Sequence, residues 1–239
     1  MKWFDRTFDT PQENLACDEA LLDWCEEDFD GEILRFWMPR QHFVVLGYSN
    51  KAQTEVNLDS CRALGVPVFR RCSGGGTVLQ GPGCLNYSLI LRIRAGSPLD
   101  DITQANALVM NRQRTALNPL LGGNVLIQGY TDLTLGGLKF SGNSQRRKRR
   151  CLLFHGSFLF GLDLDLLQRV LPMPSKQPGY RAHRSHAEFL INVSLPPAEI
   201  QNALRKAWSA DEPLLKSPND KIAQLARDKY ATDEWNLKF

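Results

Sequence analysis

The spacing of apolar residues along the chain predicts a mixture of helices and strands. In residues 12–29, apolar residues fall at helical spacing, and acidic residues supply a polar face. Helices are also predicted in five later segments: 55–64, 99–117, 163–171, 198–207 and 221–229. Strands are predicted in shorter apolar runs: 33–37, 42–47, 66–71, 85–91, 124–128, 132–135 and 152–160.

The order of these elements predicts the fold class. Strands come in runs, and helices are set among them without strict alternation, which favours an α+β fold over a doubly wound parallel sheet. Two glycines at 136–137 predict a hairpin turn that leads into Lys139. Residues 173–186 contain prolines, a glycine and several basic residues, and we expect them to form a loop.

Composition narrows the class of protein. The chain has 239 residues, of which 43% are hydrophobic and 23% are charged, as in an ordinary soluble globular protein. No stretch reaches the roughly 18 apolar residues of a membrane span, and residues 1–6 lack the apolar region of a secretory signal. We therefore expect a cytoplasmic protein with no membrane partner. The net charge of +3 is too small to indicate a nucleic-acid partner.

The six cysteines show no metal or redox pattern. None of them forms a C-x-x-C pair, which excludes a zinc ribbon and a thioredoxin motif. We expect reduced, mostly structural thiols. The cysteines are Cys17, Cys25, Cys61, Cys72, Cys84 and Cys151.

A cluster of three glycines, 74–76, follows the predicted strand 66–71. Consecutive glycines cost backbone entropy. They suit a place where the main chain approaches another group closely, or where successive N–H groups bind an anion. Arg70 and Arg71 just before them would add charged contacts to a carboxylate or phosphate. A flexible hairpin turn explains the glycine content equally well, and the spacing matches neither a dinucleotide fingerprint nor a Walker A loop.

The segment Arg-Arg-Cys-Ser-Gly-Gly-Gly-Thr-Val at 70–78 resembles a signature of the lipoate–protein ligase A family, which is related to biotin protein ligases and octanoyltransferases. Other segments are similar to the family along almost the whole chain: 14–21, 34–37, 44–50, 85–88 and 230–236. The resemblance implies an α+β catalytic domain like those of class II aminoacyl-tRNA synthetases and biotin ligases, with mainly antiparallel or mixed sheets. We expect a single domain over 1–239, without the accessory C-terminal domain of larger members.

Lys139 begins the second informative motif. A fixed lysine near a carboxyl-activation site can hold the carboxylate against the α-phosphate and stabilise charge that develops there. A lone lysine on a strand is otherwise a solvated surface residue. Ser141 and Gly142 follow it, as in the family's Lys-x-Ser-Gly motif, so the resemblance implies that Lys139 is the central catalytic residue.

Further site residues are implied by the same resemblance. Asp132 would bind Mg²⁺ or steer the incoming amine, although an aspartate at a strand start is often only a turn residue. His155 would contact the adenylate, or would be a structural histidine, and Ser157 is a weaker candidate of the same kind. The residues expected to bind nucleotide and acyl substrate are Arg71, Ser73, Gly74, Gly75, Gly76, Thr77, Val78, Leu79, Lys139, Ser144, His155 and Gly156.

Some residues depart from the family pattern. Gln80-Gly81 stand where a histidine and an aspartate are usual, Cys84 replaces a frequent asparagine, and Thr77 replaces alanine. The basic run 145–150 is typical of a solvated face, and it would alternatively cover bound nucleotide or attract an acidic carrier. A second basic cluster, with histidines at 183 and 186, lacks a third metal ligand.

The predicted function is ATP-dependent ligation. With ATP and Mg²⁺, the enzyme would convert lipoate or octanoate to an acyl-AMP and transfer the acyl group to a lysine of a lipoyl domain or a glycine-cleavage-H-like carrier, with a separate accessory chain as a further partner. The first alternative is an ATP-independent octanoyltransferase, for which Cys72, Cys84 and Cys151 are the candidate nucleophiles. The others are a non-catalytic module that binds modified carriers, and an RNA-binding protein, for which an RNP motif is missing.

Overall fold

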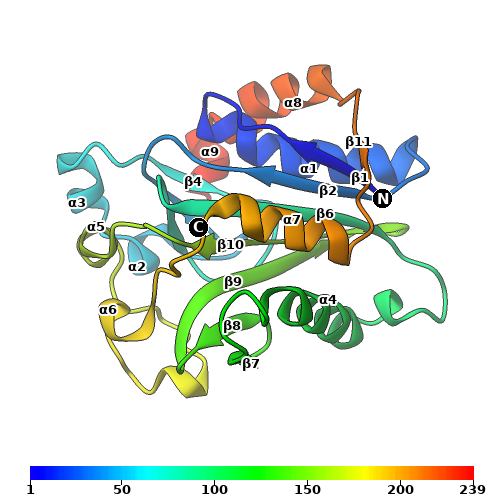
Figure 1. The fold of residues 1–239 in the computed structure, drawn as a ribbon. Coiled ribbons are helices and arrows are strands. Elements are labelled where there is room, and N and C mark those ends of the chain that lie inside the picture. Colours follow the sequence, from blue (N-terminus) through cyan, green and yellow to red (C-terminus); the bar gives the residue numbers. More distant parts are fainter.

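A mixed eight-stranded sheet runs through the middle of the molecule in the computed structural model, which describes residues 1–239 (Figure 1). Its strand order is β11-β1-β2-β6-β10-β9-β8-β7. The β11–β1 and β1–β2 pairs are parallel, and the other neighbours are antiparallel. The strands are β1 (Lys2–Asp5), β2 (Ile33–Trp37), β6 (Cys84–Arg92), β7 (Val125–Gln128), β8 (Asp132–Leu135), β9 (Leu138–Arg147), β10 (Cys151–Leu159) and β11 (Glu212–Pro213).

A second, three-stranded sheet has the order β4-β3-β5 and contains one parallel and one antiparallel pair. Its strands are β3 (Phe43–Leu46), β4 (Val68–Arg70) and β5 (Val78–Gln80). The segment between β4 and β5 is the glycine cluster, so this small sheet holds both ends of the glycine loop, residues 73–77. The two mixed sheets confirm the predicted α+β class.

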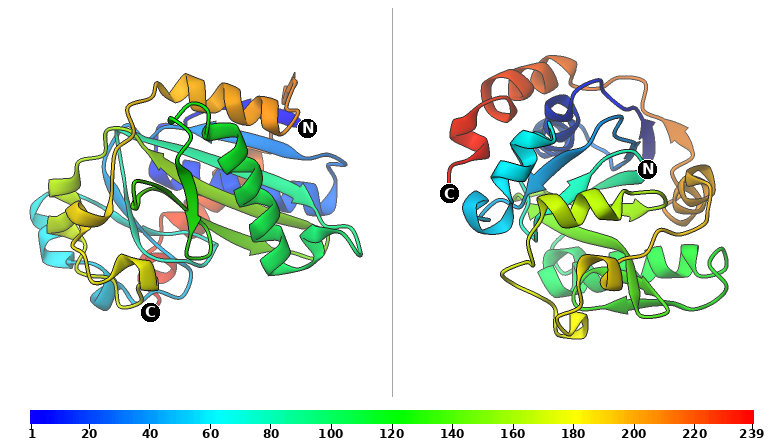
Figure 2. Two further views of the ribbon diagram at one scale, coloured as in Figure 1. Left: turned by 60° about the horizontal axis from the view of Figure 1, so that its bottom comes forward. Right: turned by 90° about the vertical axis from the view of Figure 1, so that its left-hand side faces the viewer.

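Helices cover both faces of the large sheet. The helices are α1 (Pro11–Glu27), α2 (Ala52–Glu55), α3 (Leu58–Ala63), α4 (Ile102–Leu117), α5 (Leu164–Val170), α6 (His186–Phe189), α7 (Pro197–Ala207), α8 (Asn219–Leu225) and α9 (Asp233–Asn236). Core residues place α1 and α8 on one face and α4 and α7 on the other, as the rotated views in Figure 2 show. The small sheet packs with α2, α3 and α5 around a third core.

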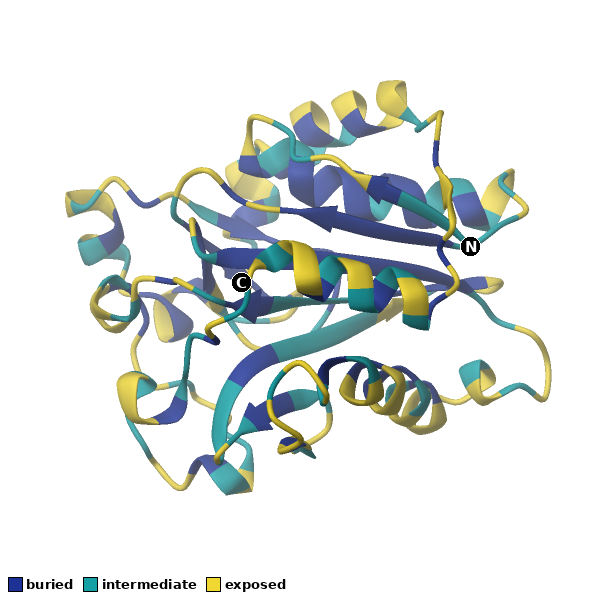
Figure 3. Ribbon diagram, viewed as in Figure 1, coloured by how far each residue is buried: buried dark blue, intermediate teal, exposed yellow.

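Local sequence explains α1 well. Thr10 and Glu13 form a capping box, and Pro11 occupies the first turn, where its missing N–H costs nothing. On β2 the side chains alternate, because Ile33 and Trp37 face the core under α1 while Leu34 and Phe36 face the opposite core. Both faces of this strand are therefore buried, and it appears dark blue in Figure 3.

The structure corrects several predicted boundaries. The predicted helix 55–64 is shorter, because α3 begins only at Leu58 and an extended Val56 separates it from α2, which ends at Glu55. The predicted helix 99–117 begins with a separate 3-10 turn, and Asp101 then caps α4. Lys139 lies in the ten-residue strand β9, which pairs with β8 across the predicted hairpin turn and for which no bounds were predicted. The loop expected at 173–186 contains a 3-10 turn and the start of α6, while β1, β5, α9 and the two-residue β11 were missed.

No helix in the chain combines the length and the apolar character needed to cross a lipid bilayer.

The core under α1 makes a testable contribution to stability. Leu21 is completely buried there, so Leu21→Ala is expected to lower the free energy of unfolding by about 2–5 kcal/mol through lost burial and a residual cavity. Urea denaturation measures this change. The matched control is Leu215→Ala, because Leu215 is 88% exposed and should change stability by less than about 0.5 kcal/mol. Equal losses in both variants would contradict this packing.

Candidate functional site

One cavity contains most of the predicted site residues. This central cavity, of about 670 Å³, lies between the glycine loop and the strands β6, β9 and β10, and residues 174–181 line its outer side. A wider groove of about 950 Å³ runs between α4 and α7, but no predicted site residue lines it. The central cavity is therefore the candidate site.

The glycine loop offers free hydrogen-bond donors at this cavity. Gly75 has a φ of +86°, a conformation that favours glycine. The carbonyl oxygens of Gly74 and Gly76 both accept from Arg71, whereas the backbone N–H groups of residues 74–77 donate to no protein acceptor. A run of unpaired N–H groups is suited to binding an anion. A Cβ at Gly47 would lie 2.1 Å from the Gly75 oxygen, so two glycines allow the close approach of these segments.

Arg71 is a buried cation in the cavity wall. Its guanidinium donates to Gly74 O at 2.6 Å, to Gly76 O at 2.7 Å and to Ser73 Oγ at 3.1 Å, and no carboxylate pairs with it. Burial lowers the pKa of Arg71 to about 10, so the side chain stays charged at neutral pH. Arg71 thus shapes the glycine loop and also leaves uncompensated positive charge at the cavity.

The expectation that Arg70 also contacts an anionic substrate is wrong. Its side chain is fully buried and points away from the cavity lining. It donates to three carbonyl groups within residues 47–50 and to the carbonyls of Trp235 and Asn236. Arg70 therefore joins α9 to the segment that packs against the glycine loop.

Lys139 faces the same cavity as the glycine loop. Its Nζ lies 2.8 Å from Asp132 Oδ1, and its side chain is 24% exposed. The Tyr180 hydroxyl donates to the other oxygen, Asp132 Oδ2, at 2.7 Å. A Cβ at position 142 would come within 2.6 Å of Lys139 Nζ, so Gly142 makes room for the lysine. This contact gives a physical reason for the Lys-x-Ser-Gly spacing.

Asp132, which was predicted to bind Mg²⁺ or to steer an amine, contacts protein groups in this structure. Both of its carboxylate oxygens already bind protein groups, one from Lys139 and one from Tyr180. No group of three or more His, Cys, Asp or Glu side chains is placed to hold a metal ion. Asp132 orients the lysine, and we assign no step to a protein-held metal.

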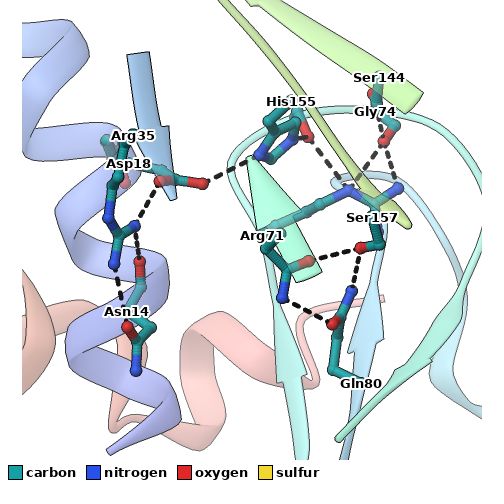
Figure 4. A network of polar contacts seen from close by, with 12 residues as sticks. Asn14, Asp18, Arg35, Arg71, Gly74, Gln80, Ser144, His155 and Ser157 are labelled. Carbon is teal, nitrogen blue, oxygen red and sulfur yellow. Dashed lines mark hydrogen bonds and ion pairs between the residues drawn. The ribbon is translucent and has the colours of Figure 1, made fainter. Parts of the chain in front are cut away.

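His155 is part of a line of polar contacts between α1 and the glycine loop (Figure 4). Its Nδ1 lies 3.1 Å from Asp18 Oδ2, and its Nε2 lies 2.6 Å from Ser73 Oγ. Asp18 in turn pairs with Arg35 at 2.5 Å. Burial opposes ionisation of Asp18, but Arg35 and His155 outweigh it and hold the pKa of this carboxyl below its ordinary value.

A closed ring of hydrogen bonds lies at another part of the cavity wall. Gln80 donates to Ser157 Oγ, Ser157 donates to Asn86 Oδ1, and Asn86 donates back to Gln80 Oε1 (Figure 4). The ring satisfies these buried or half-buried groups without any charge. Gln80 stands where the family usually has histidine, so this chain places a neutral amide at the position.

Gly156 makes room for a neighbouring side chain. A Cβ at this position would come within 1.8 Å of Asn143 Oδ1, which accepts a hydrogen bond from the Tyr87 hydroxyl. Asn143 also donates to the carbonyl of Thr131 at 2.6 Å. The glycine is therefore explained by packing between β9 and β10.

The structure brings together most, but not all, of the predicted residues. Ser73 is completely buried, and Leu79 lies in the third core, so neither lines the cavity. Gly74 also lies outside the lining and binds the Ser144 hydroxyl at 2.8 Å. The predicted residues that line the cavity are Arg71, Gly75, Gly76, Thr77, Val78, Asp132, Lys139, Ser144, His155, Gly156 and Ser157.

Several lining residues were missed by sequence reasoning. Asp18 and Asn86 are polar residues on a predicted helix and a predicted strand, so they were interpreted as structural. Both lie within segments that resemble the family, and this resemblance could have identified them. Lys176 and Arg181 belong to a segment predicted to be a loop. Four cations therefore line the cavity against two carboxylates, one of which Arg35 already neutralises.

No cysteine lines the cavity. All six cysteines are free and buried. Burial raises the pKa of Cys72 and Cys84 to about 12 and also raises the pKa of Cys151. The reactive thiolate form is therefore disfavoured at all three candidate nucleophiles.

The fold and this site match one protein family. The family model of the lipoyl protein ligase A/B catalytic domain matches residues 10–207, and the chain belongs to this family. It is 28% identical to lipoate-protein ligase A subunit 1 of Thermoplasma acidophilum, over 94% of this chain and 91% of that protein. It is also 29% identical to octanoyltransferase LipM of Carboxydothermus hydrogenoformans, over 95% and 94% of the two chains.

Solved structures give the same relationship. A bipartite lipoate protein ligase from T. acidophilum has a TM-score of 0.81 at 27% identity, with coverage of 99% of this chain and 96% of that one. A lipoate-protein ligase A bound with ATP has a TM-score of 0.80 at 27% identity, with coverage of 99% of both chains. The relatives include both a ligase and octanoyltransferases, so family membership establishes protein lipoylation chemistry without deciding how the acyl group is activated.

Thiol reactivity tests the placement of the cysteines. Because burial both shields them and raises their pKa, Ellman's reagent at mildly alkaline pH is expected to label no cysteine rapidly in the native protein. All six should react at once after unfolding in guanidinium, which serves as the control. A thiol that reacts rapidly in the native state would contradict this placement.

Proposed function

We propose that this chain is an ATP-dependent lipoate–protein ligase that forms a lipoyl- or octanoyl-AMP and transfers the acyl group to a carrier-protein lysine. The observation that carries the proposal is the composition of the cavity. An ammonium group with free donors faces a cation-rich space, and no thiol lines it. Adenylation needs the first feature, and a cysteine acyltransferase needs the missing thiol.

In the first half-reaction, a substrate carboxylate oxygen attacks the α-phosphorus of ATP and pyrophosphate leaves. A lysine ammonium has three donors, and in Lys139 one of them binds Asp132. The other two can bind one carboxylate oxygen and one α-phosphate oxygen, which reduces their repulsion and brings them together. Arg71 and the N–H groups of residues 74–77 would bind the remaining phosphate oxygens.

In the second half-reaction, the carrier lysine forms an amide bond with the acyl carbon. The bond from this carbon to the AMP oxygen breaks, AMP leaves with the electron pair, and the amine loses a proton to solvent. Apolar side chains of Leu15, Trp37, Val45 and Val78 line the cavity and would shelter the acyl chain and the mixed anhydride from water. Mg²⁺ is expected to accompany the phosphates of ATP.

The ligase proposal also implies a carrier protein and an accessory chain as partners. The lipoylation system of T. acidophilum comprises a bipartite lipoate protein ligase and its E2 lipoyl domain. By analogy we propose a lipoyl domain or a glycine-cleavage-H-like protein as acceptor, a single catalytic domain over residues 1–239, and a separate accessory chain.

The second candidate function is an ATP-independent octanoyl transfer through an acyl–cysteine. Similarity to LipM octanoyltransferases favours it. The buried state of all six cysteines and the excess of cations at the cavity favour the ligase instead.

Exchange of pyrophosphate into ATP tests the first half-reaction. The wild-type chain should catalyse exchange with lipoate or octanoate and not with biotin. Lys139→Ala is expected to lower this rate by at least about 100-fold, because the carboxylate and the phosphate then repel each other without a bridging cation. The matched control is Lys216→Ala, which removes an exposed lysine without an ion pair and should leave the rate unchanged.

Gly142→Ala separates position from charge in the same assay. It keeps the ammonium but places a Cβ where Lys139 Nζ and Cε lie, so exchange should again fall while the unfolding midpoint changes little. Full exchange in either Lys139→Ala or Gly142→Ala would show that Lys139 is not the activating group.

The transferase alternative makes the opposite prediction about ATP. With an octanoylated acyl carrier protein and a lipoyl domain, we expect no transfer without ATP and no mass gain on the enzyme, because no thiol reaches the cavity. Free octanoate with ATP should modify the lipoyl domain. Intact-mass spectrometry of the enzyme and of the lipoyl domain measures both reactions. An acyl–enzyme adduct formed without ATP would establish the transferase.

A further inference from the structure

Behind the glycine loop, a buried carboxylate on α1 is connected to the loop through two other side chains. Asp18 is 3% exposed, and its two oxygens bind Arg35 and His155. His155 binds Ser73, and Ser73 binds Arg71 (Figure 4). This chain of contacts, from Asp18 through His155 and Ser73 to Arg71, is called the relay below. It joins the first helix to the guanidinium that holds the loop carbonyls.

The chemistry of these groups fixes the direction of each hydrogen bond. Ionised Asp18 can only accept, so in the single-proton tautomer that fits both contacts the proton of His155 lies on Nδ1 and Nε2 accepts. The Ser73 hydroxyl then donates to His155 Nε2, while its oxygen accepts from Arg71 Nε at 3.1 Å. Every group has a partner in this arrangement. Reversing the histidine would place an unprotonated Nδ1 against the Asp18 carboxylate and would leave the Ser73 hydroxyl proton without its acceptor.

Arg71 transmits the orientation of Ser73 to the glycine loop at the cavity. With Nε oriented by Ser73 Oγ, the guanidinium lies where Nη2 contacts the carbonyls of Gly74 and Gly76 together. Those contacts turn the carbonyls toward Arg71 and leave the N–H groups of residues 74–77 free for an anion.

We propose that Asp18 and His155 are positioning residues that set the anion-binding shape of the glycine loop by holding Ser73 and Arg71 in one orientation. Asp18 lies some fifty residues before the loop in the sequence, and its charge acts through the histidine tautomer rather than on the substrate. The orientation of Ser73 and Arg71 by His155 does not depend on the reaction, whereas the expected effect on catalysis rests on the proposed ligase function.

The tautomer can be observed directly. NMR of the histidine ring nitrogens, assigned among the four histidines with a His155→Gln variant, should show a protonated Nδ1 and an unprotonated Nε2 in the wild type at neutral pH. In Asp18→Asn, the amide can donate to Nδ1, so the proton should move to Nε2. A wild-type His155 protonated on Nε2, or on both nitrogens, would overturn the proposal.

A double-mutant cycle tests the effect on catalysis and remains informative if Asp18→Asn does not fold. Ser73→Ala and His155→Ala should each lower kcat/KM for ATP in pyrophosphate exchange by about 10- to 100-fold, because a small displacement of the loop misplaces the phosphate. If His155 acts through Ser73, the double variant should lose no more than the larger single loss.

Gly142→Ala provides the matched control for this cycle. It displaces Lys139, which shares no hydrogen-bond partner with Ser73 or His155, so its loss should multiply with that of His155→Ala. Multiplicative losses for Ser73→Ala with His155→Ala would instead show that His155 contacts the nucleotide itself and would overturn the relay. Absence of exchange in the wild type, with the accessory chain also present, would refute the ligase function, while the NMR result would still decide the tautomer.

Discussion

The contact between Arg71 and the carbonyls of Gly74 and Gly76 is the interaction on which the site depends. A buried cation without a carboxylate partner is costly unless it is well hydrogen-bonded, and the glycine loop supplies those bonds. The loop consequently directs its carbonyls inward and keeps its N–H groups unpaired. One contact thus explains why the chain needs consecutive glycines and why the cavity favours an anion.

The remaining polar residues hold two opposing surfaces in place. On one side, the relay from Asp18 fixes Arg71, and Arg70 joins the glycine loop region to α9. On the other side, Asp132 and Tyr180 fix Lys139 above Gly142. Lys139 and the glycine loop line one cavity from different sheets, an arrangement that suits the proposed adenylation of a carboxylate.

The neutral and apolar parts of the cavity complete this picture. The ring formed by Gln80, Asn86 and Ser157 satisfies its own hydrogen bonds, so it adds polarity without charge. The thiols are packed away in the cores, where burial keeps them protonated. Chemistry at this site therefore depends on fixed cations and backbone donors, in keeping with activation of the acyl group by a nucleotide.

The sequence by itself determined the α+β class and most helices and strands, because periodicity is a local property of the chain. Its resemblance to the ligase family, rather than periodicity, singled out the two motifs that contain Arg71 and Lys139. It did not separate Arg70 from Arg71, although they are neighbours with the same charge. Their roles differ because successive side chains at the end of β4 point in opposite directions, one toward α9 and one toward the cavity. Nor did it join Asp18 to His155, or Tyr180 to Asp132, since only folding brings groups so distant in sequence within hydrogen-bond reach.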